Sequence, residues 1–98
     1  MRVDPDLARY APENVKLTVE EPGLEFGRAK EIATREARQR APNAMLLSWN
    51  DRKRGEFYPK FECGGRQRPG WIIFAESRGG NLTVDINDGE YTFIYLMM

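Results

Sequence analysis

The chain has 98 residues, with 15 basic and 15 acidic side chains and a hydrophobic content of 41%. This length fits a single domain over residues 1–98, and the composition is that of a folded protein rather than a disordered one. The zero net charge gives no support for general polyanion binding, and a chain without histidine lacks the usual general base of enzymes at neutral pH.

The single cysteine, Cys63, rules out an intramolecular disulfide and favours a reducing compartment. No run approaches the roughly 18 apolar residues of a membrane span, and the first residues lack the apolar core of a signal peptide. We therefore expect a cytoplasmic protein. Residues 1–14 contain three acids and two prolines, and we expect them to form a loosely attached arm.

Residues 24–41 are predicted to form the main helix. Small or apolar residues recur there at intervals of three and four, at Phe26, Ala29, Ile32, Ala33, Ala37 and Ala41. A narrow alanine stripe allows a helix to lie close to a sheet, and Pro42 ends the helix. Before it, residues 15–19 form either a short edge strand or a lead-in where Thr18 and Glu21 make a capping box.

After Pro42 the pattern becomes typical of strands. Five are predicted, at residues 44–49, 56–62, 71–78, 82–86 and 91–96, with glycine-rich or charged turns between them. The expected fold is α+β: one main helix packed on an antiparallel β-meander of four or five strands, residues 44–96, as a two-layer sandwich.

The last two strands predict their own register. Asp88 and Gly89 are a favoured pair for a two-residue type I′ turn, because both central positions need positive φ. The expected cross-strand pairs are Ile86 with Tyr91, Val84 with Phe93 and Leu82 with Tyr95, all on the face under the helix. If Gly79 and Gly80 form a second such turn, residues 71–78 extend this sheet.

The reverse face of that sheet suggests a binding surface. A lone helix covers one side only, so the hydrophobic residues on the other side need the arm, a second copy of the chain or another protein to cover them. We expect protein contacts, most simply in a homodimer, at Ile72, Phe74, Ile94 and Leu96 of this face and at the adjacent Trp71.

Two basic loops suggest an alternative. Arg52, Lys53 and Arg54 lie in one loop and Arg66 and Arg68 in another, with aromatic residues nearby in the sequence. Cations mixed with aromatic rings can hold phosphates while bases stack, although arginine-rich turns are commonly only solvated loops. The alternative function is therefore weak nucleic-acid binding.

Catalysis has less support. Cys63 precedes a glycine-rich loop that can expose a thiolate, which makes a small enzyme or redox protein a second alternative, but no histidine is available as its base. Glu76 and Asp85 are predicted to point to the same face of adjacent strands, where no pocket is evident. Asp85, Asp88 and Glu90 surround a turn but lack the spacing of a calcium loop. We expect neither a metal nor a cofactor.

Short motifs add a family resemblance. The helix core Ala29–Ala33, the segment Gly70–Phe74 and the closing Val84-Asp-Ile-Asn-Asp-Gly-Glu90 resemble the order in helix-plus-meander modules of the PepSY and immunity-protein-35 (YrhB-like) families. The whole chain also resembles the short uncharacterised proteins, or domains of unknown function, of prokaryotes. The first resemblance implies binding to other proteins rather than catalysis, so the sequence favours a non-enzymatic interaction module.

Overall fold

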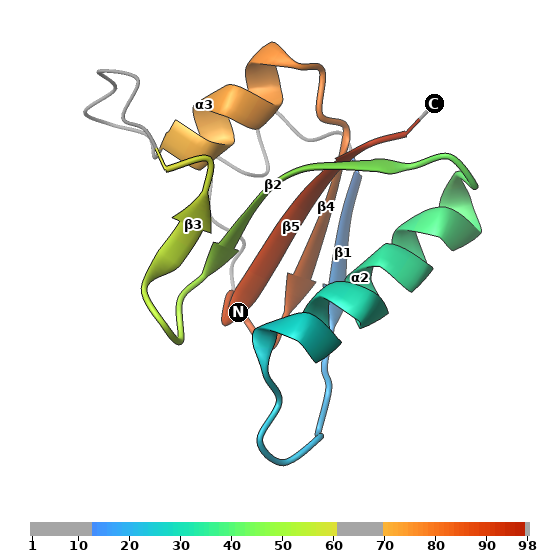
Figure 1. Cartoon of the computed structure of the whole chain (residues 1–98). Coiled ribbons are helices and arrows are strands. Elements are labelled where there is room, and N and C mark those ends of the chain that lie inside the picture. The colour runs from blue at the N-terminus through green and yellow to red at the C-terminus, as the bar shows by residue number, and fades with distance from the viewer. Residues whose placement is uncertain (1–12, 61–69, 98) are drawn as a thin grey trace.

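In the computed structural model, residues 13–60 and 70–97 are described, and they form two helices and five strands (Figure 1). In chain order the elements are β1 (Glu13–Leu17), α2 (Phe26–Arg40), β2 (Met45–Asp51), β3 (Glu56–Tyr58), α3 (Gly70–Ser77), β4 (Leu82–Ile86) and β5 (Tyr91–Leu96).

The strands form one mixed sheet in the order β1-β4-β5-β2-β3. The predicted α+β class is confirmed, and of the two interpretations of residues 15–19 the edge strand is the correct one. The expectation of a purely antiparallel meander is wrong at this edge, because β1 runs parallel to β4, with Val15 opposite Val84. The alternative capping box is also not formed, since α2 begins at Phe26 with Glu25 as its N-cap.

The β4–β5 hairpin confirms the predicted register. Ile86 pairs with Tyr91, Val84 with Phe93 and Leu82 with Tyr95. The two central turn residues have positive φ, 55° at Asp88 and 89° at Gly89, as a type I′ turn requires.

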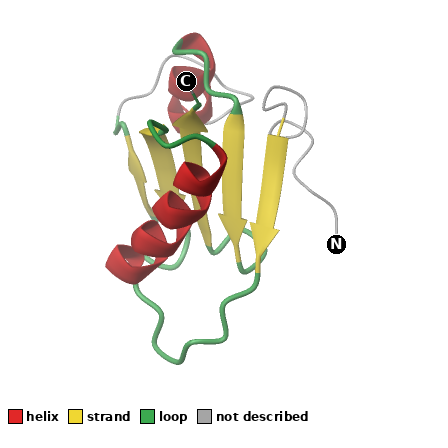
Figure 2. Cartoon of the chain, turned by 90° about the vertical axis from the view of Figure 1, so that its right-hand side faces the viewer, coloured by secondary structure: helices red, strands yellow, loops and turns green. Residues whose placement is uncertain are grey.

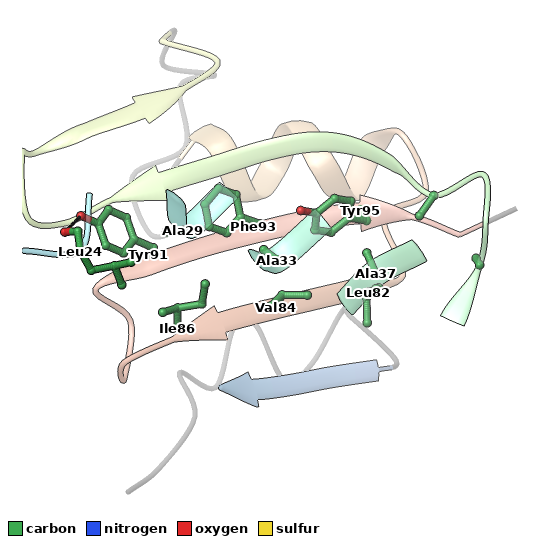
Figure 3. Close-up of a cluster of buried hydrophobic side chains, with 12 residues drawn as sticks. Leu24, Ala29, Ala33, Ala37, Leu82, Val84, Ile86, Tyr91, Phe93 and Tyr95 are labelled. Atoms are coloured by element: carbon green, nitrogen blue, oxygen red, sulfur yellow. Dashed lines mark hydrogen bonds between the residues drawn. The ribbon is translucent and has the colours of Figure 1, made fainter. Parts of the chain in front are cut away.

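The predicted core between α2 and the sheet is also confirmed. Ala29, Ala33 and Ala37 are fully buried, and their small side chains bring the helix close to β4 and β5. Figure 3 shows these alanines over the inward-facing residues of the hairpin, which are Leu82, Val84, Ile86, Tyr91, Phe93 and Tyr95. The burial of this cluster is the main stabilising contribution to the domain.

The predicted strand at residues 71–78 is wrong, because this segment forms α3. A short, continuous apolar run has no period that distinguishes a strand from a buried helix. Gly79 and Gly80 are not a hairpin turn but the end of this helix, where Gly79, at φ 83°, donates to the carbonyl of Glu76 and Gly80 to that of Ala75. This pair of hydrogen bonds is a Schellman motif.

The second helix covers the face of the sheet opposite α2 (Figures 1 and 2). Ile72 and Ala75 of α3 pack with Ile94 of β5 and with the partly buried Leu47 and Phe57. The inference that a lone helix leaves this face uncovered is therefore corrected, since α3 covers part of it. Neither helix in the described part of the chain is long and apolar enough to cross a membrane.

Candidate functional site

The residues predicted for protein contacts lie mostly inside the molecule. Trp71, Ile72 and Ile94 are buried in the cluster under α3, with exposed fractions of 7%, 1% and 0%, while Phe74 and Leu96 are half-buried. The three buried residues belong to the core of the single chain. The use of the five residues as an interface, and the homodimer that follows from it, stay predictions.

The β2–β3 hairpin places the first basic loop at one end of the sheet. Asp51 pairs with Glu56, so residues 52–55 form the turn, in which Gly55 has φ 70°. The buried carboxylate of Asp51 accepts a hydrogen bond of 3.1 Å from the backbone N–H of Arg54. This bond holds the turn in shape and leaves the side chains of Arg52, Lys53 and Arg54 exposed. Arg66 and Arg68, the second basic loop, lie outside the described residues.

A series of aromatic rings leads from this hairpin into the core. Tyr58 is stacked on Trp49, with ring centroids 6.3 Å apart and planes 19° from parallel. Trp49 contacts Phe26 at 4.4 Å, and Phe26 contacts Phe93 at 5.6 Å. Phe93, the innermost ring, is fully buried, whereas Tyr58, the outermost, is 52% exposed. The outer ring is therefore held by a rigid support while part of it remains open to solvent.

A cavity of about 260 Å³ lies where the hairpin meets the start of α2. It is lined by Glu25, Phe26, Lys53, Arg54 and Tyr91. The carbonyl oxygen of Leu24 accepts two hydrogen bonds here, from Lys53 Nζ at 2.9 Å and from the Tyr91 hydroxyl at 3.0 Å. Burial, and secondarily the charge of Asp51, raise the pKa of Tyr91. The hydrogen bond from Lys53 to Leu24 joins the β2–β3 hairpin to the segment that precedes α2.

Three cations of α2 have carboxylate partners that the cations of this loop lack. Arg28, Arg35 and Arg40 all form ion pairs with glutamates. Within residues 13–60 and 70–97, no ion pair joins Arg52, Lys53 or Arg54 to a carboxylate; Lys53 contacts a neutral carbonyl instead. The positive charge of the loop is thus only partly neutralised by close contacts.

A second hollow, of about 430 Å³, runs along α2. Its lining residues are Gly27, Lys30, Glu31, Thr34, Arg35 and Arg38. Thr34 Oγ1 lies 2.9 Å from the hydroxyl oxygen of Tyr95, whose ring faces α2 from β5. This hollow therefore lies on the same side of the sheet as the cavity and adds Lys30 and Arg38 to the cations on that side.

We call Trp49, Arg52, Lys53, Arg54 and Tyr58 the hairpin surface. Of the large hydrophobic residues in the described ranges, only Tyr58 and Met45 are exposed, and Met45 lies at the other end of β2. The sequence indicated the cations and their aromatic neighbours but missed Phe26 and Tyr91, which belong to distant elements. In the sequence, only the position of Phe26 at the leading edge of the predicted helix indicated that this helix could contact the hairpin.

The remaining candidates are not brought together. Glu76 lies on α3 and Asp85 on β4, so the prediction that they share a face of adjacent strands is wrong. Burial raises the pKa of Asp85, whose carboxylate accepts a hydrogen bond of 2.5 Å from the N–H of Gly89. Cys63 lies outside the described residues. Among those that are described, no three His, Cys, Asp or Glu side chains are grouped to hold a metal ion.

Comparisons with known proteins agree with this fold. An uncharacterized protein of Archaeoglobus fulgidus is 35% identical over 71 residues, which cover 65% of this chain and 76% of the relative. The crystal structure of protein AF1514 from the same species, strain DSM 4304, is similar with a TM-score of 0.75 at 24% identity, over 88% of this chain and 94% of that chain. This likeness supports the fold alone.

The chain also matches a family model. The expected relation to short uncharacterised prokaryotic proteins is confirmed, and the likeness to PepSY and immunity-protein-35 modules stays a prediction. The model of a domain of unknown function, DUF5619, matches residues 12–95. Because this match spans most of the sequence, the chain belongs to the DUF5619 family.

Proposed function

We propose that this protein is a non-enzymatic binding module and that it binds a negatively charged partner through the hairpin surface. The observation that carries the proposal is a run of three adjacent exposed cations without a carboxylate partner in the described residues, next to a cavity lined by two of them. An exposed cation without a carboxylate partner in its own chain gains more free energy from binding an external anion than a cation that is already paired.

The structure supports binding at this end of the sheet better than on the reverse face. Three of the five residues predicted for the reverse-face contacts are already buried by their own chain. The hairpin surface has exposed cations and an exposed ring, a combination enriched where proteins recognise anionic or aromatic partners. A cytoplasmic location is part of the proposal and fits the single cysteine.

The proposal is tested by binding of labelled polyanions at low salt. The panel contains heparin, poly-glutamate and a single-stranded oligouridine, each followed by fluorescence anisotropy. We expect at least one probe to bind, and the triple variant R52S/K53S/R54S to lose about tenfold or more in affinity, because each lost phosphate or sulfate contact removes counterion release. The double variant R28S/R35S is the matched control, since these arginines are paired on α2.

The control is expected to retain its affinity within about twofold, and both variants should fold as judged by circular dichroism. Absence of binding to all three probes, or equal binding by the wild type and the triple variant, would contradict the proposal.

A further inference from the structure

We infer that the partner is a single-stranded nucleic acid, with one base stacked on Tyr58 and the adjacent phosphates held by Arg52, Lys53 and Arg54. The inference rests on the proposed function and adds the chemical class of the partner. Bases in single strands have free faces, and stacking on an aromatic side chain is a common way in which proteins bind them.

The first support is the state of the Tyr58 ring. It is 52% exposed although an aromatic ring gains from burial, and its stacking on Trp49 fixes its plane. Trp49 is in turn fixed by Phe26, which packs against the buried Phe93. The platform is therefore already ordered before a ligand arrives, so that stacking of a base costs little conformational entropy in the protein.

The second support is the position of the cations relative to that ring. Tyr58 lies two positions beyond Glu56, the first residue after the turn, which is about 7 Å along a strand. Trp49 pairs directly with Tyr58 and, through Phe26, belongs to the cluster on the α2 side of the sheet. Lys53 and Arg54 line the cavity at the start of α2, on that same side. The ring and these two cations therefore lie on the same side of the sheet, while the guanidinium of Arg52 lies beside Gly89 in the neighbouring β4–β5 turn.

The third support is that this combination fits one partner class better than the others. A duplex hides its base faces, so an exposed stacking ring would contribute nothing to its binding. An acidic protein segment would use the cations but has no need of a flat platform. Glu25 and Glu56 also lie at this end of the sheet, and their charges limit the site to the few phosphates nearest the turn.

The salt dependence follows from this geometry. Three cations that each replace one counterion on a single strand give a slope of about −2 in log affinity against log salt. We expect the affinity for a labelled 12-residue oligouridine to fall about 20-fold between 50 and 200 mM salt.

The decisive experiment separates the ring from the charges. Y58A is expected to lower the affinity for the oligouridine by about fivefold or more, the usual range for one stacked base, and to leave the affinity for heparin unchanged. M45A is the control, because Met45 is similarly exposed at the opposite end of β2. Y58F, which keeps the ring, should bind as the wild type does.

The possible outcomes distinguish the inference from the proposed function. If Y58A binds oligouridine as the wild type does, or if heparin or poly-glutamate binds at least as tightly as oligouridine, the nucleic-acid inference is overturned while anion binding at the hairpin surface stands. If the R52S/K53S/R54S variant binds every probe normally, both fail.

Discussion

The side chain of Asn87 forms two hydrogen bonds with the backbone of Val19. The N–H of Val19 donates to Asn87 Oδ1 at 2.8 Å, and Asn87 Nδ2 donates to the carbonyl oxygen of Val19 at 3.2 Å. The backbone N–H of Asn87 also donates to the carbonyl of Leu17 at 2.9 Å. The turn of the β4–β5 hairpin therefore anchors the end of the parallel edge strand β1 and the following Val19, which lies 68 residues before Asn87 in the chain.

Replacing Asn87 by glycine should destabilise the protein by about 1–3 kcal/mol, the sum of two net hydrogen bonds of ordinary strength. Glycine tolerates the φ of 55° at this position, so the change removes the side-chain bonds without straining the turn. Asp88→Gly is the matched control, because Asp88 has the same φ and an exposed side chain. Urea denaturation of both variants is the measurement, and equal losses would show that the Val19 contact contributes nothing.

Gly80→Ala should destabilise the fold by about 1–3 kcal/mol through overpacking. A Cβ at this position would lie 2.9 Å from Ile94 Cγ2 and 3.1 Å from the carbonyl oxygen of Ala75. The backbone oxygen belongs to the hydrogen bond that ends α3, so neither neighbour can yield easily. Thermal unfolding followed by circular dichroism tests this, and an unchanged midpoint would contradict the packing of α3 on β5.

Gly27→Ala is expected to have the opposite sign. Gly27 lies in the first turn of α2, where a Cβ would meet no atom within 4 Å. Alanine lowers the conformational entropy of the unfolded chain and has the higher helix propensity, so we expect a gain of up to about 1 kcal/mol. A loss of stability in the same thermal assay would show that the start of α2 is not helical.

The buried hydroxyl of Tyr95 should make stability fall at alkaline pH. Burial raises its pKa to about 12, partly opposed by the hydrogen bond with Thr34. Because the folded pKa exceeds the unfolded value of about 10, this contribution is complete below pH 10 and is lost as the pH rises towards 12. Tyr95→Phe should flatten the alkaline decline in unfolding free energy. An identical slope in both proteins, measured by urea denaturation across that range, would exclude Tyr95 as its source.

The carboxyl group of Asp85 should have the corresponding effect in acid. Burial raises its pKa above 3.8, with the hydrogen bond from Gly89 and the charge of Lys16 acting in the opposite direction. Its stabilising contribution is therefore fully present below pH 3.8 and is lost as the pH rises through the raised pKa of the folded state. Asp85→Asn keeps an acceptor for Gly89 and should gain stability relative to the wild type across this window. A gain by the wild type instead would mean that its pKa is lowered in the fold.

The hairpin and the main helix could be predicted because their signals are local. Asp88 and Gly89 match the backbone of a type I′ turn, and the alternating residues on either side then have only one register that puts Val84 and Phe93 on the same face. The alanine spacing of α2 likewise depends on residues within a few turns of one another.

Helix α3 could not be predicted in this way. Trp71 to Phe74 are all apolar, so they have no periodicity, and both states allow them to be buried. Packing against Ile94, Leu47 and Phe57 stabilises the helical state in the fold. The same error removed the basis for the predicted reverse-face interface, because residues assigned to an open sheet face became the core under a helix.

The candidate site was also predicted only in part from the sequence. Arg52, Lys53 and Arg54 are adjacent in the chain, so the sequence alone shows that they are grouped. The proximity of Lys53 and Arg54 to Phe26 and Tyr91 depends on the contact of the hairpin with the start of α2, including the bond from Lys53 to the carbonyl of Leu24. No short-range pattern reports such a contact.

The amino-acid sequence by itself determined the α+β class, the α2 stripe and the register of the last two strands, because turn geometry and residue spacing act between neighbours. The tertiary structure decided that β1 joins β4 in parallel, that residues 70–77 are a helix, and that the aromatic series meets the basic turn. These outcomes depend on burial against segments far away in the chain, and the free energy of that burial exceeds the weak local preferences of each segment.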